Sequence, residues 1–143
     1  MAQRMPAVMP EAHDGWTQLQ TGHLTVLFHP NRRQEGRDDD IVRTTIVVGV
    51  PGKETQVLRF DPFSVGGHFH VSPTGGDDPN PDTPRPFRLR DGERPLDVAL
   101  AYFEEPDLLR ELLRQANEPE AAAAVTDEEL QVTARQIREV LAA

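Results

Sequence analysis

IVRTTIVVGV, at residues 41–50, is the densest run of β-branched side chains in the chain. Side chains that branch at Cβ pack well on the pleated surface of a sheet, so this run predicts a β-strand. Residues 51–54 read PGKE, and a Pro-Gly pair of this kind predicts a tight turn. A second strand is predicted directly after the turn, at residues 55–60. The two strands are therefore expected to pair as an antiparallel hairpin.

Further strands are predicted on both sides of this hairpin. Upstream, residues 19–29 form one predicted strand, in which apolar side chains recur with the two-residue period of a sheet. Downstream, a strand is predicted at 68–72 and a short edge strand at 87–90. Residues 73–86, PTGGDDPNPDTPRP, contain too many prolines for a helix or a central strand and are expected to form an exposed loop. The prediction is a small antiparallel sheet of four to five strands.

The apolar period becomes helical from Pro95 onward. Proline is tolerated at the first position of a helix, and helices are predicted to begin at Pro95 and at Pro106. A last helix is predicted from Thr126, because Thr126 and Glu129 match a capping box, in which each side chain bonds to the backbone N–H of the other residue. The expected apolar stripes are Leu96, Ala99, Leu100 and Phe103, then Leu108, Leu109, Leu112, Leu113 and Ala116, and finally Leu130, Ala134, Ile137 and Leu141. The predicted class is α+β, with the sheet packed on one face by the C-terminal helices.

The length fits one ordinary domain, and the composition divides the chain into four segments. Residues 1–15 are polar and interrupted by proline, and they are expected to be a disordered leader. Residues 16–117 are the predicted α+β domain, residues 118–125 a linker, and residues 126–143 an amphipathic C-terminal helix. The apolar stripe of this helix is expected to be partly exposed in the isolated chain and buried against a protein partner or a second copy. The residues concerned are Leu130, Ile137 and Leu141.

The composition excludes several classes of function. The absence of cysteine excludes disulfide bonds, thiolate nucleophiles and thiolate metal sites. No apolar run approaches the roughly 20 residues that cross a bilayer, and residues 1–13 lack the pattern of a secretory signal, so a cytoplasmic protein is expected. The net charge of −9 would repel phosphates, so nucleic-acid binding through bulk electrostatics is not expected. Fourteen of the 15 basic residues are arginine, and we interpret this bias as that of a GC-rich bacterium.

Reactive side chains concentrate in the segment RFDPFSVGGHFH, which begins at Arg59. His68 and His70 are two residues apart, so on a strand both imidazoles lie on one face while Phe69 points into the core. Two imidazoles on one face can share a metal ion or act as a general acid and a general base. Asp61 is expected to fold back across the glycine-containing connection and supply a carboxylate. Arg59 is a candidate for holding an anionic group.

Three interpretations of this segment stay open. His68, His70 and Asp61 could be structural or exposed residues without a function, with the aspartate starting a turn before proline. They could bind a divalent transition metal ion. In zinc proteins, for example, a structural site uses about four protein ligands and a catalytic site about three. They could also act without a metal, as catalytic acid and base residues or as an anion site together with Arg59. His29 is a further candidate for completing the site.

A second cluster of interest is basic. Arg85, Arg88, Arg90 and Arg94 fall within ten residues and could form a strip that binds phosphate. Acidic residues are interspersed among them, so a solvated surface of mixed charge is the other interpretation.

The order of these motifs resembles that of small bacterial proteins. Arg59-Phe60-Asp61, a short loop, His68-x-His70, a Pro-Thr-Gly turn and a helical tail resemble uncharacterised domains with an R-[FY]-D…H-x-H signature. A related-looking group is the TumE-type toxins of toxin–antitoxin pairs, which carry an R-Y-D motif and clustered histidines on a small sheet. The resemblance covers about residues 41–116 and implies a role in a toxin–antitoxin or similar defence pair.

Two functions follow as expectations. The first is an interaction or binding module of a bacterial cytoplasmic system, which would act through its sheet face and its C-terminal helix. The alternative is a small hydrolase or ribonuclease, metal-dependent or metal-free, that uses Asp61, His68 and His70. Metal analysis of the purified protein would distinguish the two.

Overall fold

The computed structural model describes residues 9, 15–29, 44–53, 55–63, 67–71 and 84–142, apart from the side chains of residues 20 and 142. Within these residues six strands form one sheet in the order β1-β2-β3-β4-β5-β6, each antiparallel to its neighbours. The strands are β1 (Thr17–Gln20), β2 (Thr25–His29), β3 (Thr45–Gly49), β4 (Leu58–Asp61), β5 (His68–Val71) and β6 (Arg85–Pro86). The helices are α1 (Pro95–Glu104), α2 (Pro106–Gln115), α3 (Pro119–Ala124) and α4 (Asp127–Ala142). The predicted α+β class is confirmed, and the sheet has one strand more than the predicted maximum of five.

The predicted central hairpin forms, but its second strand, β4, begins at Leu58 rather than at residue 55. β3 and β4 pair antiparallel with Ile46 opposite Phe60. At the turn, the backbone N–H of Lys53 donates to the carbonyl of Val50 at 3.0 Å. Of the segment predicted as the first strand of this hairpin, residues 41–43 lie outside the described residues.

Two strand predictions are wrong. The segment predicted as one strand at 19–29 is two strands, β1 and β2, joined by a turn in which Gly22 has φ of 88°. Glycine adopts this left-handed conformation without steric cost, whereas a side chain would resist it. The predicted edge strand at 87–90 is not a strand either: β6 forms two residues earlier, within the predicted loop. A proline is tolerated there because β6 is an edge strand. The remainder of that loop, residues 73–83, lies outside the described residues.

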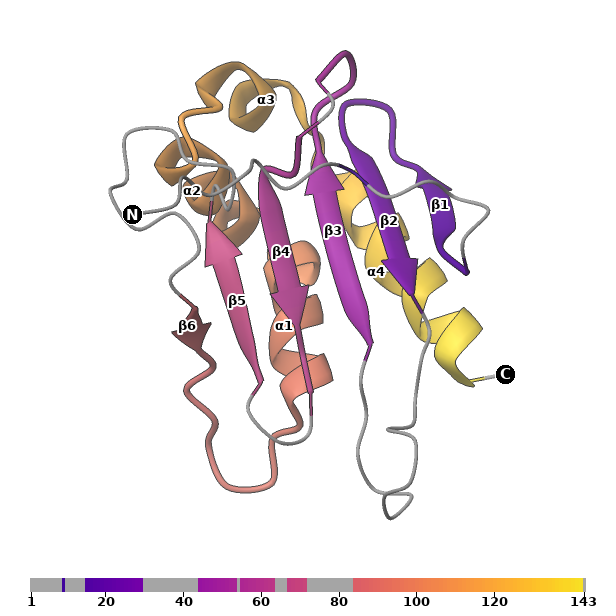
Figure 1. The fold of residues 1–143 in the computed structure, drawn as a ribbon, viewed down its shortest axis with the longest axis vertical. Helices are drawn as coiled ribbons and strands as arrows, with labels where there is room; N and C mark the ends of the chain where they lie inside the picture. The colour runs from indigo at the N-terminus through magenta and orange to yellow at the C-terminus, as the bar shows by residue number, and fades with distance from the viewer. Residues whose placement is uncertain are drawn as a thin grey trace, which may run out of the picture.

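The helices cover one face of the sheet, and Figure 1 shows α1 and α4 behind it. The core contains every second side chain of the central strands, including Phe28, Ile46, Phe60 and Phe69. This alternation is the two-residue period that the sequence predicted. The helical stripes meet the same core, with one exception. Leu108 is 43% exposed, because α2 turns its neighbouring leucines toward the sheet instead.

Two expectations about the C-terminal region are also wrong. The predicted linker at 118–125 contains a helix, α3, whose Ala121 and Ala122 are buried and which packs on α2. Alanine favours the helix intrinsically, and its small side chain permits close packing. The stripe of α4 is not partly exposed: Leu130 and Ile137 are fully buried and Leu141 is 9% exposed. α4 packs on α1 within the same core, so a partner or a second copy would have to bind the opposite side of α4.

None of the helices in the described part of the chain combines the length and the apolar character that crossing a bilayer requires. The predicted leader, residues 1–15, lies outside the described residues except for Met9 and Gly15.

Ion pairs join α1 to α4. Arg138 of α4 donates to Glu104 through Nε and Nη2, at 3.0 Å each, and to Asp97 through Nη1 at 2.9 Å. The hydrogen bond from Arg138 Nη1, together with those from Arg94, holds the pKa of Asp97 below its usual value. The ion pairs are more than one-third exposed, so we expect each to add little to stability.

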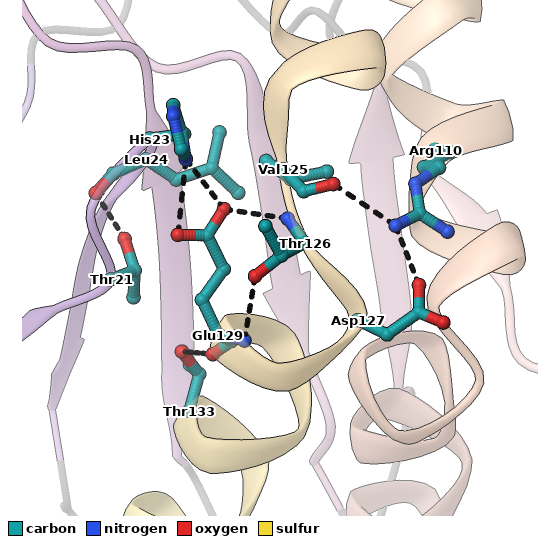
Figure 2. A network of polar contacts seen from close by, with 9 residues as sticks. All are labelled: Thr21, His23, Leu24, Arg110, Val125, Thr126, Asp127, Glu129 and Thr133. Carbon is teal, nitrogen blue, oxygen red and sulfur yellow. Dashed lines mark hydrogen bonds and ion pairs between the residues drawn. The ribbon is translucent and has the colours of Figure 1, made fainter.

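The start of α4 is tied to the turn between β1 and β2, as Figure 2 shows. Thr126 and Glu129 form the predicted capping box: Thr126 N donates to Glu129 Oε1 at 2.8 Å, and Glu129 N donates to Thr126 Oγ1 at 3.1 Å. The same carboxylate lies 2.8 Å from His23 Nδ1. His23 is therefore a turn residue that contacts the helix, not a strand residue. Arg110 makes a second connection, from α2 to Val125 O and Asp127 Oδ1.

Thr126→Ala is expected to lower the free energy of unfolding by about 1 kcal/mol, because it removes the acceptor for the Glu129 N–H. Urea unfolding followed by circular dichroism measures the change. Gln131→Ala, an exposed position on the same helix, is the control and should change stability by less than about 0.5 kcal/mol. Equal effects of the two substitutions would contradict the role of the cap.

Candidate metal centre

The reactive side chains lie on neighbouring strands in facing positions. In the β4–β5 register, Asp61 is opposite His68 and Arg59 is opposite His70. Directly opposed residues of an antiparallel pair point to the same face. All four therefore project from the face that is not covered by helices, whereas Phe69 between the two histidines is buried in the core. The predicted arrangement of the two imidazoles is confirmed.

Asp61 reaches the histidines by a different route from the one predicted. It was expected to fold back from a loop, but it is the last residue of β4 and is paired directly with His68. The turn that the Asp61-Pro62 pair predicted is present as well, because Phe63 N donates to Asp61 O at 2.8 Å. The carboxylate therefore has the positional precision of a strand rather than that of a loop.

Both imidazoles are directed at one oxygen atom. His68 Nε2 lies 3.2 Å from Asp61 Oδ2, and His70 Nε2 lies 3.8 Å from the same oxygen. The two rings are perpendicular, with centroids 4.9 Å apart. One ligand atom from each of the three residues falls within 4.8 Å of the other two.

The carboxylate of Asp61 is held in place by neighbours on two strands. Its residue is 2% exposed. Thr45 Oγ1 of β3 donates to Oδ1 at 2.8 Å, and Arg59 Nε donates to Oδ2 at 3.1 Å. These bonds fix the orientation of the carboxylate and leave Oδ2 facing the histidines, which is the role that outer-shell hydrogen bonds play at metal sites.

Arg59 has donor atoms that do not bind Asp61. Its Nε binds Asp61, and its two Nη atoms form no hydrogen bond or ion pair with the described residues. The side chain is 38% exposed, so part of it can be reached by a ligand from solvent. A guanidinium in this position can bind the two oxygen atoms of a phosphate or carboxylate group.

The surroundings of the cluster are only partly solvated. The side chains of His68 and His70 are 25% and 14% exposed. The ring of Phe63 meets that of His68 edge to face at 5.8 Å, and Val47, which is opposite Arg59 on β3, is fully buried. The interpretation of these histidines as surface residues of an open sheet therefore does not fit their environment.

For two residues, His29 and Thr45, the structure differs from the predicted set of site residues. His29 was a candidate for completing the site, and it does lie on the same face, opposite Thr45. However, its ring contacts Trp16 at 5.4 Å, and it is not among the described residues that could share an ion. Thr45 was not predicted as a site residue, since a threonine within a β-branched strand carries no signal of its contact with Asp61.

Asp61, His68 and His70 could hold a metal ion. Around an ion whose ligands are about 2.0–2.2 Å away, adjacent ligand atoms are roughly 3–3.5 Å apart, which is close to the two distances measured from Oδ2. Two imidazoles and one carboxylate suit zinc, iron, nickel or manganese better than calcium or magnesium, and three protein ligands leave coordination positions for water or substrate.

Comparison with known proteins does not assign a function. No family model, no curated protein and no solved structure matches this chain. The resemblance to TumE-type toxins stays a prediction from short motifs.

Proposed function

We propose that the chain binds one divalent transition metal ion through Asp61, His68 and His70 and acts as a small metal-dependent hydrolase. The observation that carries the proposal is the convergence of both Nε2 atoms on Oδ2 of Asp61. Two imidazoles and a carboxylate gathered around one point are suited to sharing one cation. The buried carboxylate, fixed by Thr45 and Arg59, supplies an oriented anionic ligand.

A metal-free acid and base pair is less compatible with this geometry. When separate acid and base residues act on opposite sides of the reacting bond, each needs its own access to the substrate. The substrate must therefore fit between the two groups. The rings of His68 and His70 are instead in contact, and their Nε2 atoms point to a common position.

The proposed chemistry is the hydrolysis of an anionic ester. A metal ion in a site with open positions can lower the pKa of a bound water to about 7. A metal ion held by Asp61, His68 and His70 would supply a water activated in this way. In the net reaction the water oxygen bonds to phosphorus or carbon, the ester oxygen leaves as the alcohol, and the alcohol takes up the proton that the water gives up. Arg59 would hold the anionic group of the substrate through its Nη atoms, beside the ion and on the same face.

A titration of metal-free protein tests the site. After treatment with chelator and its removal, calorimetry with Zn²⁺ and with Mn²⁺ is expected to give one saturable site per chain. His68→Ala and His70→Ala should each lower the affinity by about 100-fold or more, since the loss of a ligand exceeds the effect of removing an outer-shell partner. His29→Ala is the matched control, because His29 lies on the same face outside the cluster, and it should leave the affinity unchanged.

The same preparations test the hydrolase. At saturating metal, the wild-type chain should hydrolyse bis(4-nitrophenyl) phosphate, and Arg59→Gln should raise KM for this anionic substrate by about tenfold. KM for neutral 4-nitrophenyl acetate should not change. Absence of a saturable metal site, or an equal loss of affinity in His29→Ala, would overturn the metal centre. Metal binding without hydrolysis of either ester would retain the centre and overturn the hydrolase.

A further inference from the structure

A pocket is lined by residues of β5, β6 and α1 and by the residues that flank β6. β6 is the edge strand on this side of the sheet (Figure 1). The volume of the pocket is about 510 Å³, within the range of sites for small organic molecules. The described residues that line it are Phe69, Pro84, Arg85, Pro86, Phe87, Arg88, Val98 and Tyr102. None of them takes part in the metal centre, since Phe69 points to the face opposite His68 and His70.

Aromatic rings form one side of this pocket. The ring of Phe69 stacks on that of Phe87, with centroids 5.5 Å apart and planes at 29°, and meets the ring of Tyr102 at the same distance. Phe69 is nearly fully buried, whereas Phe87 and Tyr102 are each partly exposed. Phe87 is held by its backbone, which donates to Gly67 O at 3.3 Å. The pocket therefore offers preformed ring surfaces on which a planar group can stack.

Positive charge forms the other side. Arg85 donates through Nη1 to Gln115 Oε1 at 2.7 Å, and its guanidinium lies over the ring of Phe69 at 5.9 Å from the centroid. Arg88 is exposed at the rim. No aspartate or glutamate is among the described lining residues, although the chain as a whole carries a net charge of −9. A local pair of arginines without acidic neighbours favours an anionic ligand.

This arrangement divides the four-arginine strip between its two interpretations. Arg94 pairs with Asp97, and Arg90 does not line the pocket. Arg85 and Arg88 are the members of the strip that share a concave surface with aromatic rings. Tyr102 adds a hydroxyl to the lining, and this hydroxyl is a donor at neutral pH because a tyrosine is protonated there. Burial raises its pKa further.

We infer that this pocket binds a small planar aromatic anion, with its ring against Phe87 and Tyr102 and its anionic group between Arg85 and Arg88. Any ligand of this class has one aromatic ring system that carries one phosphate or carboxylate group. Stacking requires the ring and the arginines require the charge, so neither a neutral aromatic compound nor an inorganic anion meets both demands. The inference is independent of the metal centre, which lies on the opposite face of β5.

Calorimetric titration in the presence of EDTA tests this inference, because the chelator prevents binding of anions to a metal ion. The probes are adenosine 5′-monophosphate and 2-naphthoate as aromatic anions, with adenosine and inorganic phosphate as matched compounds that lack the charge or the ring. At least one aromatic anion is expected to bind saturably, and both matched compounds should bind about tenfold or more weakly.

Two arginine variants provide the structural control. Arg88→Gln should weaken binding of the aromatic anion by about tenfold, because it removes a charged hydrogen-bond donor at the rim. Arg90→Gln, an exposed arginine two residues away that does not line the pocket, should leave the affinity unchanged. The inference would be overturned by the absence of saturable binding of both aromatic anions at millimolar concentration. It would also be overturned if adenosine or inorganic phosphate bound as tightly as the stronger aromatic anion, or if the two substitutions had equal effects.

Discussion

Asp61→Asn is expected to abolish the gain in stability that the proposed metal centre predicts when a divalent metal ion is added. A ligand that binds only the folded state at 100 times its Kd raises the free energy of unfolding by about 2.7 kcal/mol. Asparagine has nearly the shape of aspartate, but it removes the negative charge that both imidazoles and Arg59 face at Oδ2. The increase with metal should therefore fall below about 0.5 kcal/mol if affinity drops 100-fold or more, by the same relation.

Urea unfolding with EDTA and with Zn²⁺ at 100 times the wild-type Kd measures this difference. Asp107→Asn is the matched control, because its side chain is 97% exposed at the start of α2. It should retain the full increase with metal. A full increase in Asp61→Asn would show that the ion binds elsewhere, and the proposed centre would then be wrong.

Phe60→Ala is expected to have the largest effect on the stability of the metal-free fold. Phe60 is fully buried and contacts the rings of Phe69, Tyr102 and Phe103, with centroids between 5.5 and 6.1 Å away. Truncating a buried phenylalanine to alanine costs about 3–5 kcal/mol, since it removes buried apolar surface and leaves a cavity. The loss should appear in urea unfolding with EDTA, followed by near-ultraviolet circular dichroism.

Leu108→Ala is the control for this substitution, because Leu108 is 43% exposed on α2. It should change stability by less than about 0.5 kcal/mol. If Phe60→Ala proves too unstable to purify, Phe60→Leu should fold with a smaller loss, because leucine fills more of the cavity than alanine. A loss from Phe60→Ala no larger than that from Leu108→Ala would contradict the position of Phe60 at the centre of the core.

The two proposed sites use opposite faces of one short strand. β5 directs His68 and His70 toward the metal centre and Phe69 toward the aromatic pocket. This division is a direct result of the two-residue period of a strand. The pocket and the metal centre can therefore be tested separately, and failure of one proposal leaves the other standing.

Several features of this protein were determined by local sequence. The alternation in HFHV placed both imidazoles on one face, and the spacing of Thr126 and Glu129 predicted a capping box whose two bonds are present. The starts of α1 and α2 followed from proline and the change of apolar period. Each of these features depends on residues within about one turn of a helix or a few positions of a strand, so spacing alone is sufficient.

Only the tertiary structure decided what these local elements meet. The β4–β5 register placed Asp61 opposite His68, and β3 brought Thr45 to the same carboxylate. Docking of α4 on α1 buried the stripe that was expected to be exposed, while Gly22 split one predicted strand into two. Strand register and helix docking are set by packing between segments far apart in the chain, and a one-residue shift would reverse every side chain. The candidate residues could therefore be read from the sequence, but their convergence on one oxygen atom could not.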